Sequence, residues 1–183
     1  NQKNINFIVA DYRGYGFSNG MPNVENTQSD AHVVLDFVLK NLKEQNYSGP
    51  LILMGRSLGS VSVLELVKRY PRDFKGLIIE SGFANEDSLF KLIGTTSDGV
   101  GFKKEDGFLN VEKIKKYTGP LLIIHGEMDH IVPFSQGELL HHFCPSKNKK
   151  FLPIPNANHN NILGVSPQLF FKEVEGFVNH RLK

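Results

Sequence analysis

The sequence has little of what several classes of protein require. Its single cysteine, Cys144, excludes an internal disulfide framework. The 21 basic and 19 acidic residues nearly cancel and are scattered, so no nucleic-acid-binding surface is indicated. No apolar run approaches the roughly 20 residues that cross a bilayer. The start shows no signal-peptide pattern, so a cytoplasmic location is the default expectation, and the oligomeric state is left open.

The length and composition suit one folded domain. Of the 183 residues, 40% are apolar and 22% are charged, as in ordinary globular proteins. The first residue is asparagine, and a strand-like run follows within a few residues. We therefore expect a single domain over residues 1–183 that is incomplete at its N-terminus.

Five short apolar runs, rich in branched side chains, predict strands. They are mostly continuous rather than alternating, which is typical of parallel strands covered on both faces by helices. The last run contains Pro153, which cannot donate to a strand ladder and so predicts a place near the sheet edge. The runs are residues 5–10, 51–54, 77–79, 121–124 and 150–154.

Helical periodicity fills the gaps between these runs. One apolar stripe recurs at helical spacing within 31–42, and a second helix, from residue 58 to 67, is apolar almost all round. A capping-box pattern at Ser135 predicts a helix through 143, and Ser166 with Pro167 predicts the start of the last helix. The alternation indicates an α/β fold with a mostly parallel sheet. Residues 83–117 break it and are interpreted as a lid insertion.

The strongest chemical signal is Gly-Arg-Ser-Leu-Gly at residues 55–59. A serine hydroxyl is a weak nucleophile until an adjacent base takes its proton. In Gly-x-Ser-x-Gly the serine occupies a sharp strand-to-helix turn that exposes its oxygen, and Ser57 lies between a predicted strand and a predicted helix. The following helix N-terminus also favours a negatively charged oxygen.

Two later loops supply an acid and a base. Asp129, with Glu127 as the competing acid, follows the strand at 121–124, and His159 follows the strand at 150–154. The carboxyl ends of parallel strands are where ligands and catalytic groups gather. The order serine, acid, histidine is the one expected for a strand–turn–helix nucleophile of this kind.

With these motifs in hand, the chain resembles the α/β-hydrolase superfamily from the fourth strand of that fold onward. The stretch 11–20, the elbow at 55–59 and the His-Gly-x-x-Asp-x-x-Val-Pro stretch at 125–133 resemble a small-lid group of α/β-hydrolase domain-containing proteins. That group neighbours serine aminopeptidases and monoacylglycerol-lipase-like enzymes. The resemblance implies that Ser57 is the nucleophile, Asp129 the acid and His159 the base.

The resemblance also bears on the oxyanion hole. It implies one donor in the Leu58 backbone N–H and a second in a loop that we expect upstream of residue 1. Losing one such donor typically costs about 2.7–4 kcal/mol of transition-state stabilisation. Ser60 stands where many relatives carry a second glycine.

Three further residues are candidates for substrate binding: Tyr12, Phe83 and Ile131. A glycine-rich surface turn is an equal interpretation for the loop of Tyr12, and lid phenylalanines more often pack onto the body. The expected function is hydrolysis of esters or thioesters of small to medium acyl groups, without metal or cofactor. A peptidase or amidase, or a non-catalytic binding protein of the same fold, remains an alternative.

Overall fold

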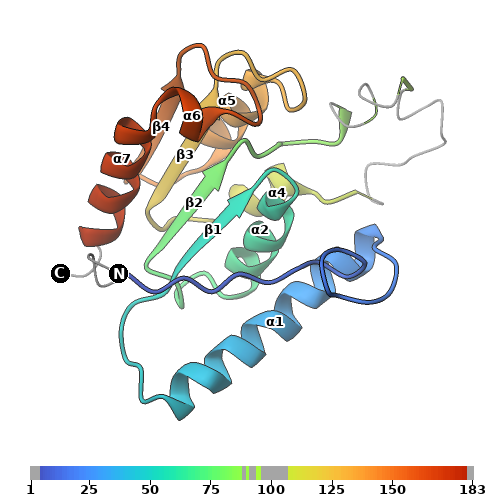
Figure 1. The fold of residues 1–183 in the computed structure, drawn as a ribbon, viewed down its shortest axis with the longest axis vertical. Helices are drawn as coiled ribbons and strands as arrows, with labels where there is room; N and C mark the ends of the chain where they lie inside the picture. Colours follow the sequence, from blue (N-terminus) through green and yellow to red (C-terminus); the bar gives the residue numbers. More distant parts are fainter. Residues whose placement is uncertain (1–4, 88–89, 91–93, 96–106, 181–183) are drawn as a thin grey trace. The chain divides into compact units, whose positions relative to one another are not determined.

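The structure is a computed structural model that describes residues 5–87, 90, 94–95 and 107–180. The chain forms two compact units, residues 1–48 and 49–183. The first unit consists of an irregular segment followed by one long helix, and the second contains a sheet with helices on both faces (Figure 1).

The first unit is built around helix α1, Val24–Glu44. Its start is fixed by a reciprocal pair in which the Asn26 N–H donates to the Asn23 side chain at 2.7 Å and the Asn23 N–H donates to the Asn26 side chain at 2.8 Å. Ala31 and Leu35 of the predicted stripe are buried. Val34 of the same stripe is exposed, so the buried face of this helix is narrower than the stripe that its sequence predicts.

The predicted strand at residues 5–10 is wrong. The segment has no regular secondary structure, and several of its apolar side chains are exposed, Val9 at 87%. A strand needs a hydrogen-bonded neighbour, and each strand that the structure describes pairs only with others of the second unit. High strand propensity in 5–10 is therefore not enough to form a ladder.

The second unit contains a four-stranded parallel sheet in the order β1-β2-β3-β4. The four remaining strand predictions are confirmed with shifts of one or two residues at their ends. Pro153 lies in β4, which among the described strands pairs only with β3, so the predicted edge position is also confirmed. The strands are β1 (Ile52–Arg56), β2 (Gly76–Glu80), β3 (Leu121–Gly126) and β4 (Lys149–Ile154).

Helices cover both faces of this sheet, as Figure 1 shows. On one face Ile78, Leu122 and Ile154 pack with residues of α6 and α7, such as Ile162 and Phe170. On the other face α2 contacts β1 and β2, α5 contacts β3 and β4, and α4 packs against these two helices. The helices are α2 (Gly59–Arg69), α4 (Asn110–Ile114), α5 (Phe134–Phe143), α6 (Ile162–Val165) and α7 (Pro167–Asn179).

Two helix starts were predicted from sequence, with different outcomes. Helix α7 begins at Pro167 after Ser166, as expected. The capping box at Ser135 is wrong, because α5 begins one residue earlier with Pro133 at the N-cap and no side-chain cap. Gln136, within that first turn, instead accepts hydrogen bonds from the Ala84 and Asn85 N–H groups at 2.9 and 3.1 Å.

Much of the predicted lid, 83–117, lies outside the described residues, including Phe102. The described ends of the segment meet each other. The Asn110 side chain donates to the Phe83 carbonyl at 2.9 Å, and the rings of Phe83 and Phe108 pack edge to face at 5.8 Å. The segment thus leaves and rejoins the second unit at one place, and its role as a lid stays a prediction.

Candidate active site

Ser57 lies in a sharp turn between β1 and α2. Its φ of +51° is in the left-handed region, which a residue with a side chain adopts only under constraint. A Cβ on Gly55 would lie 2.4 Å from the Gly59 carbonyl oxygen, so the close approach of these two backbones requires glycine. The Ser60 hydroxyl donates to the Ser57 carbonyl at 2.7 Å and closes the turn. The structure thus has the sharp strand-to-helix turn that the sequence predicts at residues 55–59.

Asp129 lies in the loop after β3, 6% exposed. Its Oδ1 accepts hydrogen bonds from the Ile131 N–H at 3.0 Å and the Val132 N–H at 2.8 Å. These bonds leave Oδ2 as the oxygen that faces the imidazole of His159.

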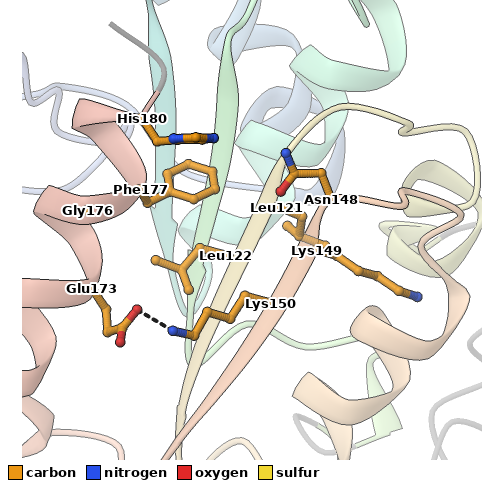
Figure 2. Close-up of a pocket in the computed structure, with 9 residues that line it drawn as sticks. All are labelled: Leu121, Leu122, Asn148, Lys149, Lys150, Glu173, Gly176, Phe177 and His180. Atoms are coloured by element: carbon orange, nitrogen blue, oxygen red, sulfur yellow. Dashed lines mark hydrogen bonds and ion pairs between the residues drawn. The ribbon is translucent and has the colours of Figure 1, made fainter. Parts of the chain in front are cut away.

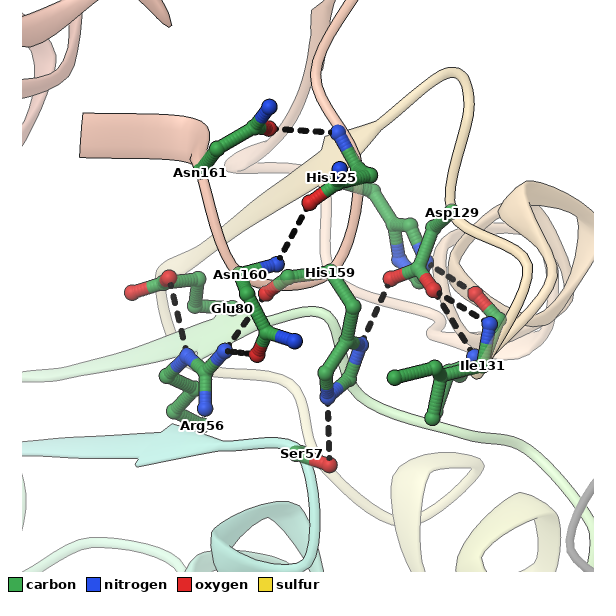
Figure 3. Close-up of polar contacts among 11 residues, drawn as sticks. Arg56, Ser57, Glu80, His125, Asp129, Ile131, His159, Asn160 and Asn161 are labelled. Atoms are coloured by element: carbon green, nitrogen blue, oxygen red, sulfur yellow. Dashed lines mark hydrogen bonds and ion pairs between the residues drawn. The ribbon is translucent and has the colours of Figure 1, made fainter. Parts of the chain in front are cut away.

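His159 lies in the loop after β4 and joins the other two side chains. Its Nδ1 is 2.7 Å from Oδ2 of Asp129, and its Nε2 is 3.0 Å from the Ser57 hydroxyl (Figure 3). The structure therefore brings together the three residues that the sequence singled out. Glu127, the alternative acid, is exposed, and Asp129 holds the contact with His159.

The ionised state of Asp129 determines which ring nitrogen of His159 carries a proton. Burial alone would raise the pKa of Asp129, but hydrogen bonds from His125, His159 and the Val132 N–H hold that pKa well below its usual range. An ionised carboxylate only accepts, so Nδ1 of His159 carries a proton. Nε2 of a neutral His159 is then free to accept the Ser57 hydroxyl proton.

His125 is a member of this site that sequence reasoning missed. It is fully buried at the end of β3, and its Nε2 lies 2.9 Å from the Val132 carbonyl and 3.4 Å from Oδ2 of Asp129. Both neighbours are acceptors, so Nε2 carries the proton. Among the described residues, Nδ1 of His125 has no partner. The only sequence signal was its place in the 125–133 stretch.

Arg56 and Glu80 form a second group that the sequence did not reveal. The Nε of Arg56 lies 3.3 Å from Glu80, and its Nη2 donates to the His159 carbonyl at 2.5 Å and to the Asn160 side chain at 3.1 Å (Figure 3). Burial raises the pKa of Glu80, and the neighbouring Arg56 guanidinium opposes that rise.

The other predicted site residues have different positions. None of the described residues accepts a hydrogen bond from the Leu58 N–H, which directly follows Ser57. Ile131 is half-buried beside Asp129. Phe83 is 1% exposed and packs in the interior of the second unit. Tyr12 belongs to the first unit, and its part in substrate binding stays a prediction.

A cavity of about 230 Å³ lies at the other edge of the sheet (Figure 2). Leu121 and Lys149, the first residues of β3 and β4, line it together with Phe177 of α7. Ser57, Asp129 and His159 follow the carboxyl ends of parallel strands, so this cavity is separate from their site. Within the described ranges, no group of three His, Cys, Asp or Glu side chains is arranged to hold a metal ion.

The fold and the elbow agree with the comparison to known families. A sequence model described as serine aminopeptidase, S33, matches residues 1–96. The chain belongs to this family of the α/β-hydrolase superfamily.

Individual relatives are similar over much of the chain. Alpha/beta hydrolase domain-containing protein 17C of Mus musculus is 30% identical over 181 residues, 98% of this chain and 52% of that protein. The uncharacterized protein YfhR of Escherichia coli is 28% identical over 160 residues, 86% of this chain and 54% of that protein. The chain thus spans about half the length of these relatives.

Solved structures share the fold at lower sequence identity. Est1E from Butyrivibrio proteoclasticus with bound ferulic acid has a TM-score of 0.72 at 22% identity and covers 93% of this chain and 75% of its own. A monoacylglycerol lipase of Paleococcus ferrophilus has a TM-score of 0.69 at 15% identity, and the match covers 93% of this chain and 82% of the lipase. An acylaminoacyl peptidase of Pyrococcus horikoshii has a TM-score of 0.70 at 19% identity, and the match covers 90% of this chain and 31% of the peptidase. In the described part of this chain, no helix is long and apolar enough to cross a membrane.

Proposed function

We propose that this α/β-hydrolase cleaves carboxylic ester or thioester bonds by a serine mechanism with an acyl-enzyme intermediate. The observation that supports the proposal is the continuous chain of hydrogen bonds from the Ser57 hydroxyl through His159 to Asp129, at 3.0 and 2.7 Å. A base within hydrogen-bond reach of a hydroxyl, itself oriented by a buried carboxylate, is what activates a serine at neutral pH.

In the first half of the reaction, the Ser57 oxygen attacks the substrate carbonyl carbon while Nε2 of His159 takes the hydroxyl proton. Asp129 stabilises the imidazolium that forms and remains ionised. The oxyanion of the tetrahedral intermediate faces the Leu58 N–H at the start of α2, where the helix field also favours negative charge. Collapse breaks the bond to the alkoxide or thiolate, and His159 returns the proton to that leaving group.

The second half runs through water. His159 takes a proton from a water molecule as its oxygen attacks the acyl carbon bound to Ser57. The new tetrahedral intermediate collapses, the bond to the Ser57 oxygen breaks, and the proton returns to that oxygen. The carboxylic acid leaves and the free serine is restored.

A fluorophosphonate probe tests the proposal directly, because it reacts with an activated serine. We expect the purified protein to be labelled at Ser57, and we expect Ser57→Ala to remain unlabelled while keeping its circular dichroism spectrum. Absence of labelling in a folded protein would contradict the proposal and favour a non-catalytic binding role for the fold.

The family match and one structural neighbour favour a second candidate, in which the bond that is cleaved is an amide or peptide bond. The matching family is described as serine aminopeptidase, and one structural neighbour is an acylaminoacyl peptidase. Hydrolysis of p-nitrophenyl esters measured against aminoacyl-naphthylamides separates the two. We expect the ester rates to exceed the amide rates, and the reverse result would favour the peptidase.

A further inference from the structure

Ser57 follows β1 and His159 follows β4, the first and the last strand in the order of the described sheet. The two residues must nevertheless meet. The order β1-β2-β3-β4 places two strands between the strand of Ser57 and the strand of His159. At about 4.8 Å per strand, β1 and β4 are roughly 14 Å apart. The loop after β4 must therefore reach back across the ends of β3 and β2 to bring the imidazole to Ser57.

Several contacts hold the beginning of that loop, including a hydrogen bond from the Asn158 N–H to the Asn161 side chain at 2.6 Å. Above β3, the Met128 N–H donates to the Ala157 carbonyl at 2.9 Å. Within the loop, the Asn160 N–H and the Asn158 side chain form a local turn at 2.9 Å. These contacts anchor the beginning of the loop, on the side that lies far from β1.

Arg56 supplies a contact at the other end. It is the last residue of β1 and immediately precedes Ser57, so its backbone is part of the same turn as the serine. Its Nη2 donates to the carbonyl of His159 itself at 2.5 Å and to the Asn160 side chain at 3.1 Å. One guanidinium thus joins the serine turn to the backbone of the residue that must meet the serine.

Glu80 orients that guanidinium. It is the neighbour of Arg56 in the β1–β2 register and is 6% exposed, and its carboxylate lies 3.3 Å from Nε of Arg56. A carboxylate so buried needs a cation, and a planar guanidinium can meet it on one edge while donating elsewhere with another. The Ser57 N–H also donates to the Glu80 carbonyl at 2.9 Å. The backbone of Glu80 therefore contacts Ser57, while its side chain contacts Arg56.

We propose that Arg56, oriented by Glu80, is a positioning residue that holds the His159 backbone so that the imidazole reaches Ser57 and Asp129 together (Figure 3). The inference deepens the proposed serine hydrolase mechanism and rests on it for its effect on rate. Its structural part, the tether between Arg56 and the His159 loop, is independent of whether Ser57 reacts.

Three variants test this inference. Arg56→Met keeps the aliphatic stem and removes every donor, whereas Arg56→Lys keeps the charge opposite Glu80 but lacks the fork that spans two partners. Lys150→Met is the control, because it breaks an ion pair of the same unit that lies far from Ser57 and is more exposed, Lys150 with Glu173, at the amino end of β4. Thermal unfolding and circular dichroism establish that each variant is folded.

The first measurement is the low-field proton resonance of the His159 Nδ1–H, assigned by its loss in His159→Gln. We expect this resonance to shift or broaden in Arg56→Met and to stay unchanged in Lys150→Met. The resonance reports the hydrogen bond to Asp129 whether or not Ser57 is reactive. It therefore tests the tether even if the hydrolase proposal fails.

The second measurement is the rate of fluorophosphonate labelling at Ser57. We expect Arg56→Met to slow labelling by roughly 10- to 100-fold, the cost of a small misplacement of a catalytic base. We expect Arg56→Lys to have a melting temperature close to that of wild type but a labelling rate at Ser57 that remains below the wild-type rate. If Arg56→Met does not fold, Arg56→Lys carries the comparison.

The outcomes separate the two proposals. A wild-type protein that does not label contradicts the hydrolase mechanism. A folded Arg56 variant with an unchanged His159 resonance and an unchanged labelling rate overturns the positioning role. Equal changes in Lys150→Met also overturn it, because they would show a general loss of stability instead of a specific tether.

Discussion

Nε2 of His125 lies 3.4 Å from Oδ2 of Asp129, the same carboxylate oxygen that His159 contacts at 2.7 Å. The His159 Nδ1–H donates to this oxygen, and the His125 Nε2–H, which donates to the Val132 carbonyl, lies beside it. The Ile131 and Val132 N–H groups donate to the other oxygen. The carboxylate is held from four directions, and this arrangement favours its ionised form.

Removing the His125 donor should weaken the loop that carries Asp129. In His125→Phe the Val132 carbonyl loses its partner, and Asp129 loses one donor. We expect the free energy of unfolding in urea to fall by about 1–3 kcal/mol, together with slower labelling of Ser57. His141→Phe is the control, since His141 is a half-buried helix residue beside Phe151. Equal losses in the two variants would contradict the role given to His125.

The charge of Asp129 should matter more than its shape. Asp129→Asn is close in size but cannot stabilise an imidazolium or fix the imidazole tautomer. If the proposed serine mechanism operates, we expect labelling of Ser57 to slow by about 10³- to 10⁴-fold. The protein should remain folded at neutral pH, as measured by circular dichroism. A labelling rate within a few-fold of wild type would exclude Asp129 as the acid.

Asp129 should also contribute to the pH dependence of stability. Its pKa is lower in the folded protein than in the unfolded chain, so the unfolded state binds the proton more readily in acid. The stabilisation is present above about pH 4, the ordinary pKa of an aspartate, and is lost as the pH falls toward the folded value. Urea denaturation from pH 6 down to pH 3 should show a steeper decline for wild type than for Asp129→Asn. Parallel curves would contradict this assignment.

The left-handed backbone of Ser57 predicts that glycine and alanine substitutions there differ in their effect on the free energy of unfolding. Alanine and glycine both remove the hydroxyl, but only glycine adopts a φ of +51° without steric cost. We expect Ser57→Gly to be more stable than Ser57→Ala by about 1 kcal/mol, measured by urea denaturation. Loss of labelling should be equal in both. An alanine variant as stable as the glycine variant would argue against strain in the turn.

Two glycine substitutions should have opposite effects. A Cβ on Gly55 would lie 2.4 Å from the backbone oxygen of Gly59, so Gly55→Ala must distort the serine turn and destabilise the protein. Gly176 lies inside α7 with no atom within 4 Å of an added Cβ. Gly176→Ala should therefore stabilise the protein by about 0.5–1 kcal/mol through helix propensity. Thermal unfolding of the two variants checks both signs.

Local pattern alone determined much of the fold. The apolar runs that became the four strands and the helical stripes between them were readable because burial on both faces imposes continuous apolar sequence on a parallel strand. Ser57, Asp129 and His159 were found because each follows such a run, and the carboxyl ends of parallel strands lie at one edge of the sheet. Alternating strands and helices place the loops after the strands at that edge, whatever contacts the side chains make there.

Tertiary structure decided what depends on partners far away in the chain. The run at residues 5–10 had strand propensity but no ladder to join, and Ser135 had a capping pattern but a helix that begins before it. The contact of Asp129 with His159 and the contacts of His125 and Arg56 arise from strand register and loop paths. Such contacts join residues up to about a hundred positions apart, such as Arg56 and His159. Local periodicity carries no information about them, because it reports which face of an element is buried and not what that face meets.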